Sequence, residues 1–181
     1  YDIVNMNEVQ IHEIFSAMLI SVNGFLSPFE RIVNFSIIER DFSIKNNELT
    51  QKGTFKRKNI LLNYKPTIDQ MYKKDYVSLY NEEKEIKFPN WLIREVGTIK
   101  SNIKWDGNQI LIIDKNLLLP FRWSEKTISI GNFSYNIKGQ IFDLESFIKC
   151  PKLWLGNQKF VEFCSKTIFR VKDSTPYPEI N

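Results

Sequence analysis

The sequence predicts an α+β protein in which a helix, a strand and a helix are followed by a small antiparallel β-rich module. Two observations support this class. Apolar residues before position 73 recur at helical spacing around one β-branched run, and beyond position 97 short strand-like runs are joined by glycine-containing turns. The chain has 181 residues, of which 43% are hydrophobic and 25% charged, which is typical of a soluble globular protein large enough to bury its own core.

The first predicted helix runs from about Asn7 to Gly24. Asn5 or Asn7 can cap its start, and Gly24 stands where a left-handed residue commonly ends a helix. One face carries the apolar side chains of Ile11, Ile14, Phe15, Met18, Leu19 and Val22. This spacing predicts an amphipathic helix.

A strand and two helices are expected next. The β-branched and aromatic run 31–39 predicts a strand that continues through Phe42 and Ile44 to a turn at Asn46 and Asn47. Thr54 can cap a helix that begins at Phe55 and ends before Pro66. Because proline is tolerated in the first turn of a helix, a second short helix is expected over 66–72.

The polar stretch 73–87 predicts a linker, so we expect residues 1–74, 75–87 and 88–181 to be a first domain, a linker and a β-rich module. In the module, strands at 98–105 and 109–114 flank Asp106-Gly107-Asn108, and strands at 127–130 and 134–142 flank Gly131-Asn132. A helical or irregular segment over 144–164 is broken by Pro151 and Gly156, and a strand is expected over 167–171.

The sequence lacks the residue patterns that several classes of function require. Cys150 and Cys164 have no neighbouring metal-ligand pattern, and His12, the single histidine, has no catalytic motif around it, so we expect no metal site and two reduced cysteines. Glycine-rich nucleotide loops and zinc-protease motifs are absent from the sequence. The net charge of +4 is spread along the chain, which disfavours nucleic acid as a partner. With no apolar run of membrane-spanning length and no signal peptide pattern, a cytoplasmic location is expected.

The remaining candidate for chemistry is the basic stretch around Lys52-Gly53-Thr54. Placed at a helix start, it could bind a phosphate through free backbone N–H groups and through Lys56, Arg57 and Lys58. Gly53 would let the backbone approach a ligand closely or adopt a positive φ. The alternative is an ordinary solvated basic surface.

Six elements of the first 72 residues have the order and spacing of a known family. They are the run 8–28, which contains the first predicted helix, the run F-E-R-I-V-N-F-S-I-I at 29–38, D-F-S-I at 41–44, N-E-L-T at 47–50, F-K-R-K-N-I at 55–60, and Tyr64 followed by I-D-Q-M-Y at 68–72. Together they resemble the end of the C-terminal domain of adenylate-forming (AMP-binding) enzymes, and within it the long-chain acyl-CoA synthetase and acyl- or aryl-CoA ligase branch. The resemblance covers roughly two-fifths of the chain.

The resemblance implies a two-step ligase. A fatty or aryl carboxylic acid would react with ATP to give an acyl-adenylate, and CoA or the phosphopantetheine of a carrier protein would then accept the acyl group. ATP or AMP and Mg²⁺ would be bound mainly by an N-terminal adenylation domain that this chain lacks. The chain starts at Tyr1 and not at a methionine, so we expect it to be the C-terminal piece of a longer enzyme that is inactive by itself.

The resemblance also implies a catalytic lysine in the loop before the last helices. An ungapped alignment puts Thr54 at that position, with Lys52 and Lys56 as the nearest basic residues and the catalytic candidates. Lys52 is preferred because related sequences carry Lys-Gly in this loop. Gly53, Thr54 and Arg57 are the candidate nucleotide-binding residues. Thr54 leaves a second possibility, a non-catalytic module derived from such a ligase that docks a carrier protein or a partner subunit.

Overall fold

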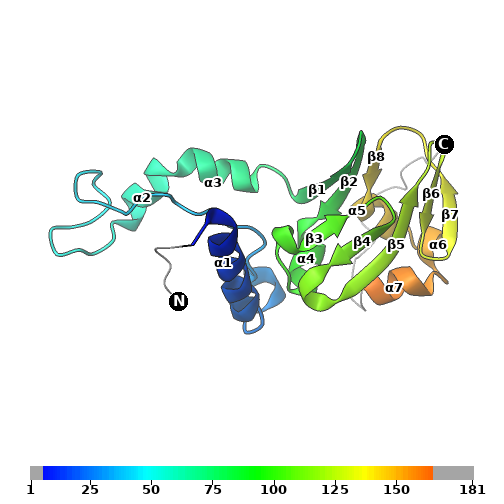
Figure 1. The fold of residues 1–181 in the computed structure, drawn as a ribbon, viewed down its shortest axis with the longest axis horizontal. Helices are drawn as coiled ribbons and strands as arrows, with labels where there is room; N and C mark the ends of the chain where they lie inside the picture. Colours follow the sequence, from blue (N-terminus) through cyan, green and yellow to red (C-terminus); the bar gives the residue numbers. More distant parts are fainter. Residues whose placement is uncertain (1–5, 165–181) are drawn as a thin grey trace. The chain divides into compact units, whose positions relative to one another are not determined.

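A computed structural model describes residues 6–164 and confirms an α+β protein with a β-rich module (Figure 1). The chain divides into two compact units. Unit 1 combines Tyr1–Val33 with Tyr76–Asn181, and unit 2 comprises Asn34–Asp75. Unit 2 is thus inserted in the sequence of unit 1. The strand expected over 167–171 lies outside the described residues.

Helix α1 spans Glu8–Asn23 and begins as the sequence predicts. Asn7 is its N-cap, and a capping box joins Asn7 and Gln10, each side chain accepting a hydrogen bond from the other residue's backbone N–H (2.9 and 3.0 Å). The left-handed end expected at Gly24 is wrong, because this residue has φ −63°. The chain keeps winding in a right-handed sense here, with the Phe25 N–H bonded to the Val22 carbonyl.

Arg31 joins the ends of two helices within unit 1. It follows the short 3-10 helix η2 (Pro28–Glu30), and its Nε donates to the carbonyl of Asn23 (3.1 Å) at the end of α1. Its Nη1 donates to the carbonyls of Arg94 (2.7 Å) and Glu95 (2.8 Å) near the end of α4 (Asn90–Val96). A planar, permanently charged group thereby satisfies carbonyls that a helix end leaves free.

The segment expected as a linker, 75–87, is instead part of a β-hairpin. Strand β1 (Tyr76–Asn81) pairs antiparallel with β2 (Lys84–Pro89), and Glu82 turns the chain with φ +53°. Strand β8 (Ile141–Asp143) then pairs parallel with β2. The charged residues that suggested a linker occupy the tip and the polar face of this hairpin.

The larger sheet of unit 1 has the strand order β3-β4-β5-β6-β7, all neighbours antiparallel. Both hairpins predicted from glycine-containing turns are present: Gly107 between β3 and β4 has φ +93°, and Gly131 between β6 and β7 has φ +56°. Strand β5 was not predicted. The strand bounds are β3 Ile103–Trp105, β4 Gln109–Ile112, β5 Leu117–Trp123, β6 Thr127–Ile130 and β7 Phe133–Asn136, with 3-10 helices η3 (Lys100–Asn102) and η4 (Ile113–Lys115).

Three short helices complete unit 1 in the predicted region: α5 (Leu144–Ile148), α6 (Pro151–Trp154) and α7 (Gln158–Cys164). Aromatic residues fill the space between them and the strands. Phe147 packs edge-on against Phe160 with ring centroids 5.0 Å apart. The buried members of this core include Phe88, Trp105, Phe121, Trp123, Trp154, Phe160, Phe163 and Cys164.

Unit 2 contains helices α2 (Arg57–Asn63) and α3 (Lys65–Tyr72) and a long stretch without regular structure before them. Pro66 lies in the first turn of α3, as predicted. The strand expected over 31–39 is wrong: the described structure pairs this segment with no other strand. A β-branched run becomes a strand only when a neighbour bonds its backbone.

Candidate functional site

The candidate residues lie in unit 2, where two turns follow each other: Lys52, Gly53, Thr54 and Lys56 are on the second turn, and Arg57 is at the helix start after it. In the first turn, the Asn47 N–H bonds to the Ile44 carbonyl (2.9 Å), and Asn47 has φ +58°, a conformation that asparagine tolerates well. The Glu48 N–H then bonds to the Ser43 carbonyl (3.0 Å). The first turn therefore fixes the direction in which the chain enters the second.

The second turn is a short hairpin from Glu48 to Lys56, called here the lysine hairpin. The Lys56 N–H bonds to the Glu48 carbonyl (2.7 Å), and the Thr50 N–H bonds to the Thr54 carbonyl (2.9 Å). The Gly53 N–H closes the tip on the Thr50 carbonyl (2.9 Å), and Gly53 has φ +78°. Glycine adopts this conformation without the steric cost of a Cβ atom, which explains the Lys-Gly pair in the sequence.

This geometry corrects the expectation that Thr54 caps a helix. The Thr54 N–H bonds to the Thr50 hydroxyl (3.1 Å), and helix α2 begins later, at Arg57, with Lys56 as an N-cap that makes no side-chain bond to the helix start. Gly53 and Thr54 are therefore in the hairpin and only Arg57 is at a helix start. The structure does not gather the three around a helix N-terminus.

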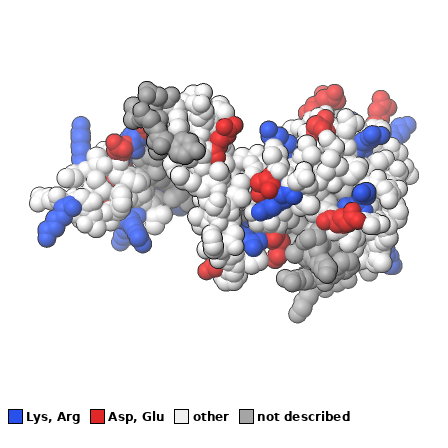
Figure 2. Space-filling model, turned by 60° about the horizontal axis from the view of Figure 1, so that its bottom comes forward, with Lys and Arg blue, Asp and Glu red and all other residues white. Residues whose placement is uncertain are grey.

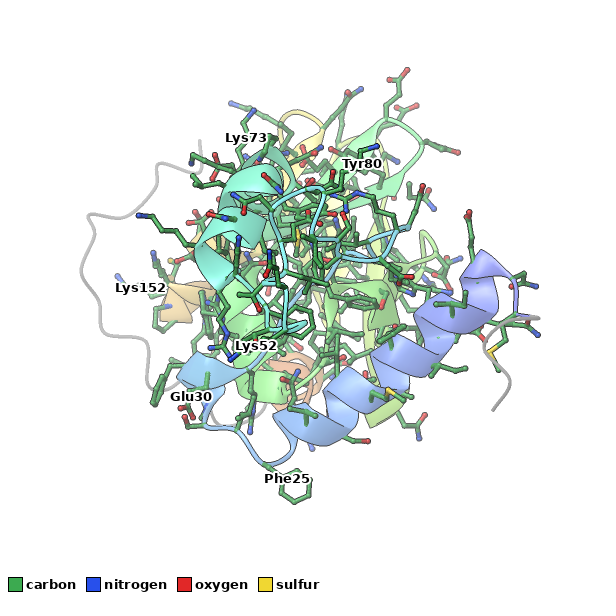
Figure 3. All side chains as sticks on the ribbon, turned by 90° about the vertical axis from the view of Figure 1, so that its left-hand side faces the viewer. Phe25, Glu30, Lys52, Lys73, Tyr80 and Lys152 are labelled. Atoms are coloured by element: carbon green, nitrogen blue, oxygen red, sulfur yellow. The ribbon has the colours of Figure 1, made fainter. Side chains whose placement is uncertain are left out.

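The two candidate lysines have different surroundings. Lys56 is half-buried, and its Nζ donates to the Asn47 side-chain oxygen (2.5 Å), so that it ties the lysine hairpin to the first turn. Lys52 is exposed at the hairpin tip (Figure 3), and the hydrogen bonds and ion pairs among residues 6–164 leave its ammonium free. Of the two lysines, Lys52 has the more exposed side chain.

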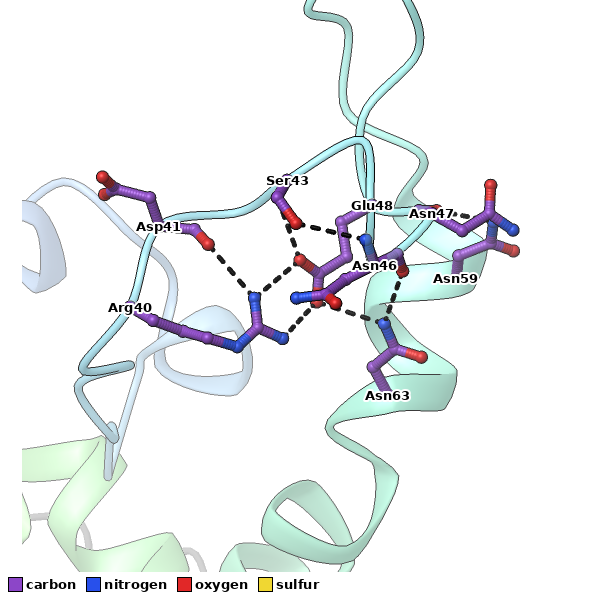
Figure 4. Close-up of polar contacts among 8 residues, drawn as sticks. All are labelled: Arg40, Asp41, Ser43, Asn46, Asn47, Glu48, Asn59 and Asn63. Atoms are coloured by element: carbon purple, nitrogen blue, oxygen red, sulfur yellow. Dashed lines mark hydrogen bonds and ion pairs between the residues drawn. The ribbon is translucent and has the colours of Figure 1, made fainter.

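Beneath the hairpin, the Glu48 carboxylate is fully buried and has three kinds of donor around it (Figure 4). Arg40 binds it with both terminal nitrogens, Nη2 to Oε1 at 2.7 Å and Nη1 to Oε2 at 2.8 Å. The Ser43 N–H (3.1 Å) and the Asn63 amide (3.1 Å) donate to the same carboxylate. Segments before the hairpin and helix α2 after it are thus bonded to one side chain.

These hydrogen bonds favour the charged form of Glu48 and lower its pKa to about 2, with the Arg40 bond as the largest cause. Burial acts in the opposite direction and is outweighed. The same hydrogen bond raises the pKa of Arg40. The pair is therefore fully ionised at neutral pH.

Aromatic rings support the same network from one side. The Arg40 guanidinium lies over the Tyr64 ring, 5.5 Å from its centroid, and Phe42 packs edge-on against both Tyr64 (6.0 Å) and Phe55 (5.6 Å). Phe55 belongs to the lysine hairpin and pairs across it with Leu49. The hairpin thus has an apolar support as well as an ionic one.

Arg40, Glu48 and Asn63 were not predicted as members of this site. Arg40 is eight positions before Glu48, and Asn63 is fifteen positions after it, on a helix whose start was misplaced. The available signal was the pair of asparagines followed by a glutamate, which predicted a turn and gave no indication of a buried carboxylate.

Positive and negative side chains are mixed on the face of the described residues that Figure 2 shows. On the face shown in Figure 2, lysine and arginine side chains stand apart from one another and acidic side chains lie among them. Within residues 6–164, no helix is long and apolar enough to cross a membrane.

A comparison with known families gives a match over the first part of the chain. Residues 2–76 match the family model described as the AMP-binding enzyme C-terminal domain, which covers about two-fifths of the chain and all of unit 2. This supports a relationship of this segment to the AMP-binding superfamily. Searches of curated proteins and of solved structures found no significant match.

Proposed function

We propose that this chain is the C-terminal part of an ATP-dependent acyl ligase, in which the lysine hairpin supplies a cation for adenylate formation. The observation that carries the proposal is the free ammonium of Lys52, exposed at the tip of a braced hairpin inside the segment that matches the AMP-binding C-terminal domain. The substrate class is a fatty or aryl carboxylic acid.

In the first step, a carboxylate oxygen of the substrate attacks the α-phosphorus of ATP, and the bond to pyrophosphate breaks. Negative charge grows on the oxygens around the α-phosphorus, where a positioned ammonium stabilises the transition state. In the second step, the sulfur of CoA or of a carrier-protein phosphopantetheine attacks the acyl carbon, AMP leaves, and the thiol proton is released.

Each candidate residue has a distinct role in this proposal. Lys52 is the catalytic cation, and Gly53 allows the backbone beside it to approach the nucleotide. Thr54 and Arg57 are further nucleotide-binding candidates on either side of Lys56. Because Lys56 is engaged with Asn47, its main role is to hold the hairpin, and it becomes the alternative cation only if that bond opens.

The N-terminal adenylation domain is the principal partner in this proposal. It would hold ATP and Mg²⁺, while the C-terminal part closes over the nucleotide. Closure would deliver Lys52 and exclude water from an intermediate that water can hydrolyse. The 181-residue chain alone is therefore expected to show no turnover.

ATP–pyrophosphate exchange tests the proposal. The enzyme that carries this chain together with an adenylation domain is assayed with a panel of fatty and aryl acids. The proposal expects exchange that depends on one class of acid, and no exchange by the 181-residue chain under the same conditions. Absence of exchange with every acid would contradict it.

Thr54, at the position of the family's lysine, favours a second candidate function. In that case the chain docks a carrier protein or a partner subunit without catalysis. A pull-down with a phosphopantetheinylated carrier protein as bait distinguishes the two. Retention that is the same with and without ATP, in a protein that lacks exchange activity, would support the docking role.

A further inference from the structure

Glu48 contributes to unit 2 through both its backbone and its side chain. Its backbone begins the lysine hairpin, because its carbonyl accepts from the Lys56 N–H (2.7 Å) and its own N–H is bonded to Ser43 (3.0 Å). Its side chain is fully buried under the same hairpin. The residue that starts the hairpin is therefore also its anchor.

The anchor is held from outside the hairpin. Arg40 binds both carboxylate oxygens, and bidentate binding fixes orientation as well as distance. Asn63, from helix α2, donates to Oε1 and also to the carbonyl of Asn46 in the first turn. A rotation of the hairpin about its base would break several of these bonds together.

Lys52 lies four residues from Glu48, at the other end of the hairpin. Its side chain is long and flexible, so the position of its ammonium depends on where the backbone of the tip is held. An error of about 1 Å in the placement of a catalytic group can reduce a rate by about a hundredfold. A brace at the base of the hairpin therefore matters for a cation at its tip.

We propose that Arg40 and Glu48 are positioning residues that hold the lysine hairpin so that Lys52 meets the reacting phosphate. The inference rests on the proposed function, because it assigns a role in adenylate formation to two side chains that are bonded to each other at the base of the hairpin. The inference has two separate requirements, called here the first and second demand. The Arg40–Glu48 pair must order the hairpin, and the effect of the pair on the rate of adenylate formation must depend on Lys52.

The first demand is tested on the 181-residue chain by amide hydrogen exchange. Glu48→Gln keeps the shape of the side chain and removes its charge, and Arg40→Lys keeps the charge and removes the bidentate geometry. Each change is expected to raise the exchange rates of the Gly53 and Thr54 amides at least about tenfold. The matched control is Glu39→Gln, at an exposed position of the same unit, which should leave these rates unchanged. Unchanged protection in both variants would overturn the inference.

The second demand is tested by a double-mutant cycle in the ligase that carries the adenylation domain. Glu48→Gln is expected to lower kcat for ATP–pyrophosphate exchange by about tenfold, with KM for ATP within about twofold of its original value. In a Lys52→Ala background, the same change should have no further effect, because the two residues act as one unit.

The outcomes separate the two proposals. If Glu48→Gln lowered kcat by the same factor in the original enzyme and in the Lys52→Ala variant, Glu48 would act through general stability. This result would overturn the positioning role and leave the role of Lys52 unchanged. No effect of Lys52→Ala would overturn the proposed catalytic role and the positioning role with it.

Discussion

Protonation of the Glu48 carboxylate should control the stability of unit 2 in acid. Its pKa is about 2 in the folded protein against an ordinary value of 4.5, so the unfolded chain takes up a proton first. The stabilisation is fully present above pH 4.5 and is lost as the pH falls from 4.5 towards 2. Urea unfolding of unit 2, followed by its amide signals across this pH range, measures the loss.

The matched variants for this prediction are Glu48→Gln and Glu39→Gln. Glu48→Gln removes the titrating group, so the urea midpoint of unit 2 should be lower at neutral pH and should change less between pH 4.5 and pH 2. Glu39→Gln should retain the original pH profile. If the urea midpoint of unit 2 changed equally with pH in the original protein and both variants, Glu48 would not be the group that makes unit 2 sensitive to acid.

Arg31 gives a second prediction at the scale of a residue. Its guanidinium bonds to the carbonyls of Asn23, Leu26, Arg94 and Glu95, and Arg31→Ala would leave these acceptors without their donor. Because hydrogen bonds with a charged partner contribute about 1.5–3 kcal/mol, the free energy of unfolding of unit 1 should fall by at least about 2 kcal/mol. Chemical denaturation measures it.

Arg122→Ala is the control for this change, because Arg122 is exposed on β5. It should change the free energy of unfolding by less than about 0.5 kcal/mol. Equal losses for the two arginines would contradict the role assigned to Arg31.

How far single residues could be predicted from the sequence differs between Lys52 and its support. Lys52 was proposed as a candidate because sequences of the family that this segment resembles carry Lys-Gly in this loop, and its role stays a prediction. Arg40 and Glu48 were not proposed, because their pairing depends on a fold of the intervening turn that no local pattern specifies. The expected helix cap at Thr54 was wrong for a related reason: the Thr54 N–H is bonded to the Thr50 hydroxyl across the hairpin, which places Thr54 before the helix start.

At the scale of an element, the two glycine turns predict different sensitivities. Gly53 has φ +78°, and a Cβ atom added there would meet open space, so Gly53→Ala should cost unit 2 only the left-handed strain, about 1 kcal/mol. Gly53→Asn should cost less than Gly53→Val, because asparagine tolerates this conformation and a β-branched residue does not. Urea midpoints of the three variants give the ranking, and a reversed order would contradict the hairpin geometry.

Gly131 is the stricter case. It has φ +56°, and an added Cβ atom would overlap the side-chain oxygen of Asn157. Asn157 is fully buried, its Nδ2 donates to the Ile130 carbonyl (2.7 Å), and its side-chain oxygen accepts from the Phe160 N–H (3.2 Å). Strain and overlap together should lower the free energy of unfolding of unit 1 by at least about 2 kcal/mol for Gly131→Ala, measured by chemical denaturation. Gly139→Ala, also at a positive φ but in open space, should lose less and serves as the control.

Elements with two local signals were the predictable ones. The hairpins at Gly107 and Gly131 combine a turn with alternating strands on both sides, and both are present. The run 31–39 had only one signal, the composition of a strand, and no strand pairs with it in the described chain. The β1–β2 hairpin was missed because its turn, at Glu82, carries no glycine and its charged residues resemble a linker.

At the scale of the whole molecule, sequence similarity and compactness divide the chain differently. The family match covers residues 2–76 as one segment. The division into compact units instead assigns the residues before position 34 to unit 1, together with the β-rich part. Arg31 accounts for this in physical terms, since it binds carbonyls of α4, far along the sequence. The boundaries at 74 and 87 followed polarity, which marks surfaces as well as linkers.

The proposed function predicts that Lys52 serves one half of the reaction. The measurement that tests it most directly compares two single-turnover rates in the ligase with its adenylation domain: formation of the acyl-adenylate from ATP and acid, and transfer of the acyl group from supplied acyl-adenylate to CoA. Lys52→Ala should lower the first rate at least about tenfold and leave the second unchanged, while Lys65→Ala, at an exposed position on α3, alters neither. Equal rates of adenylate formation in the Lys52→Ala variant and the original protein would contradict the account.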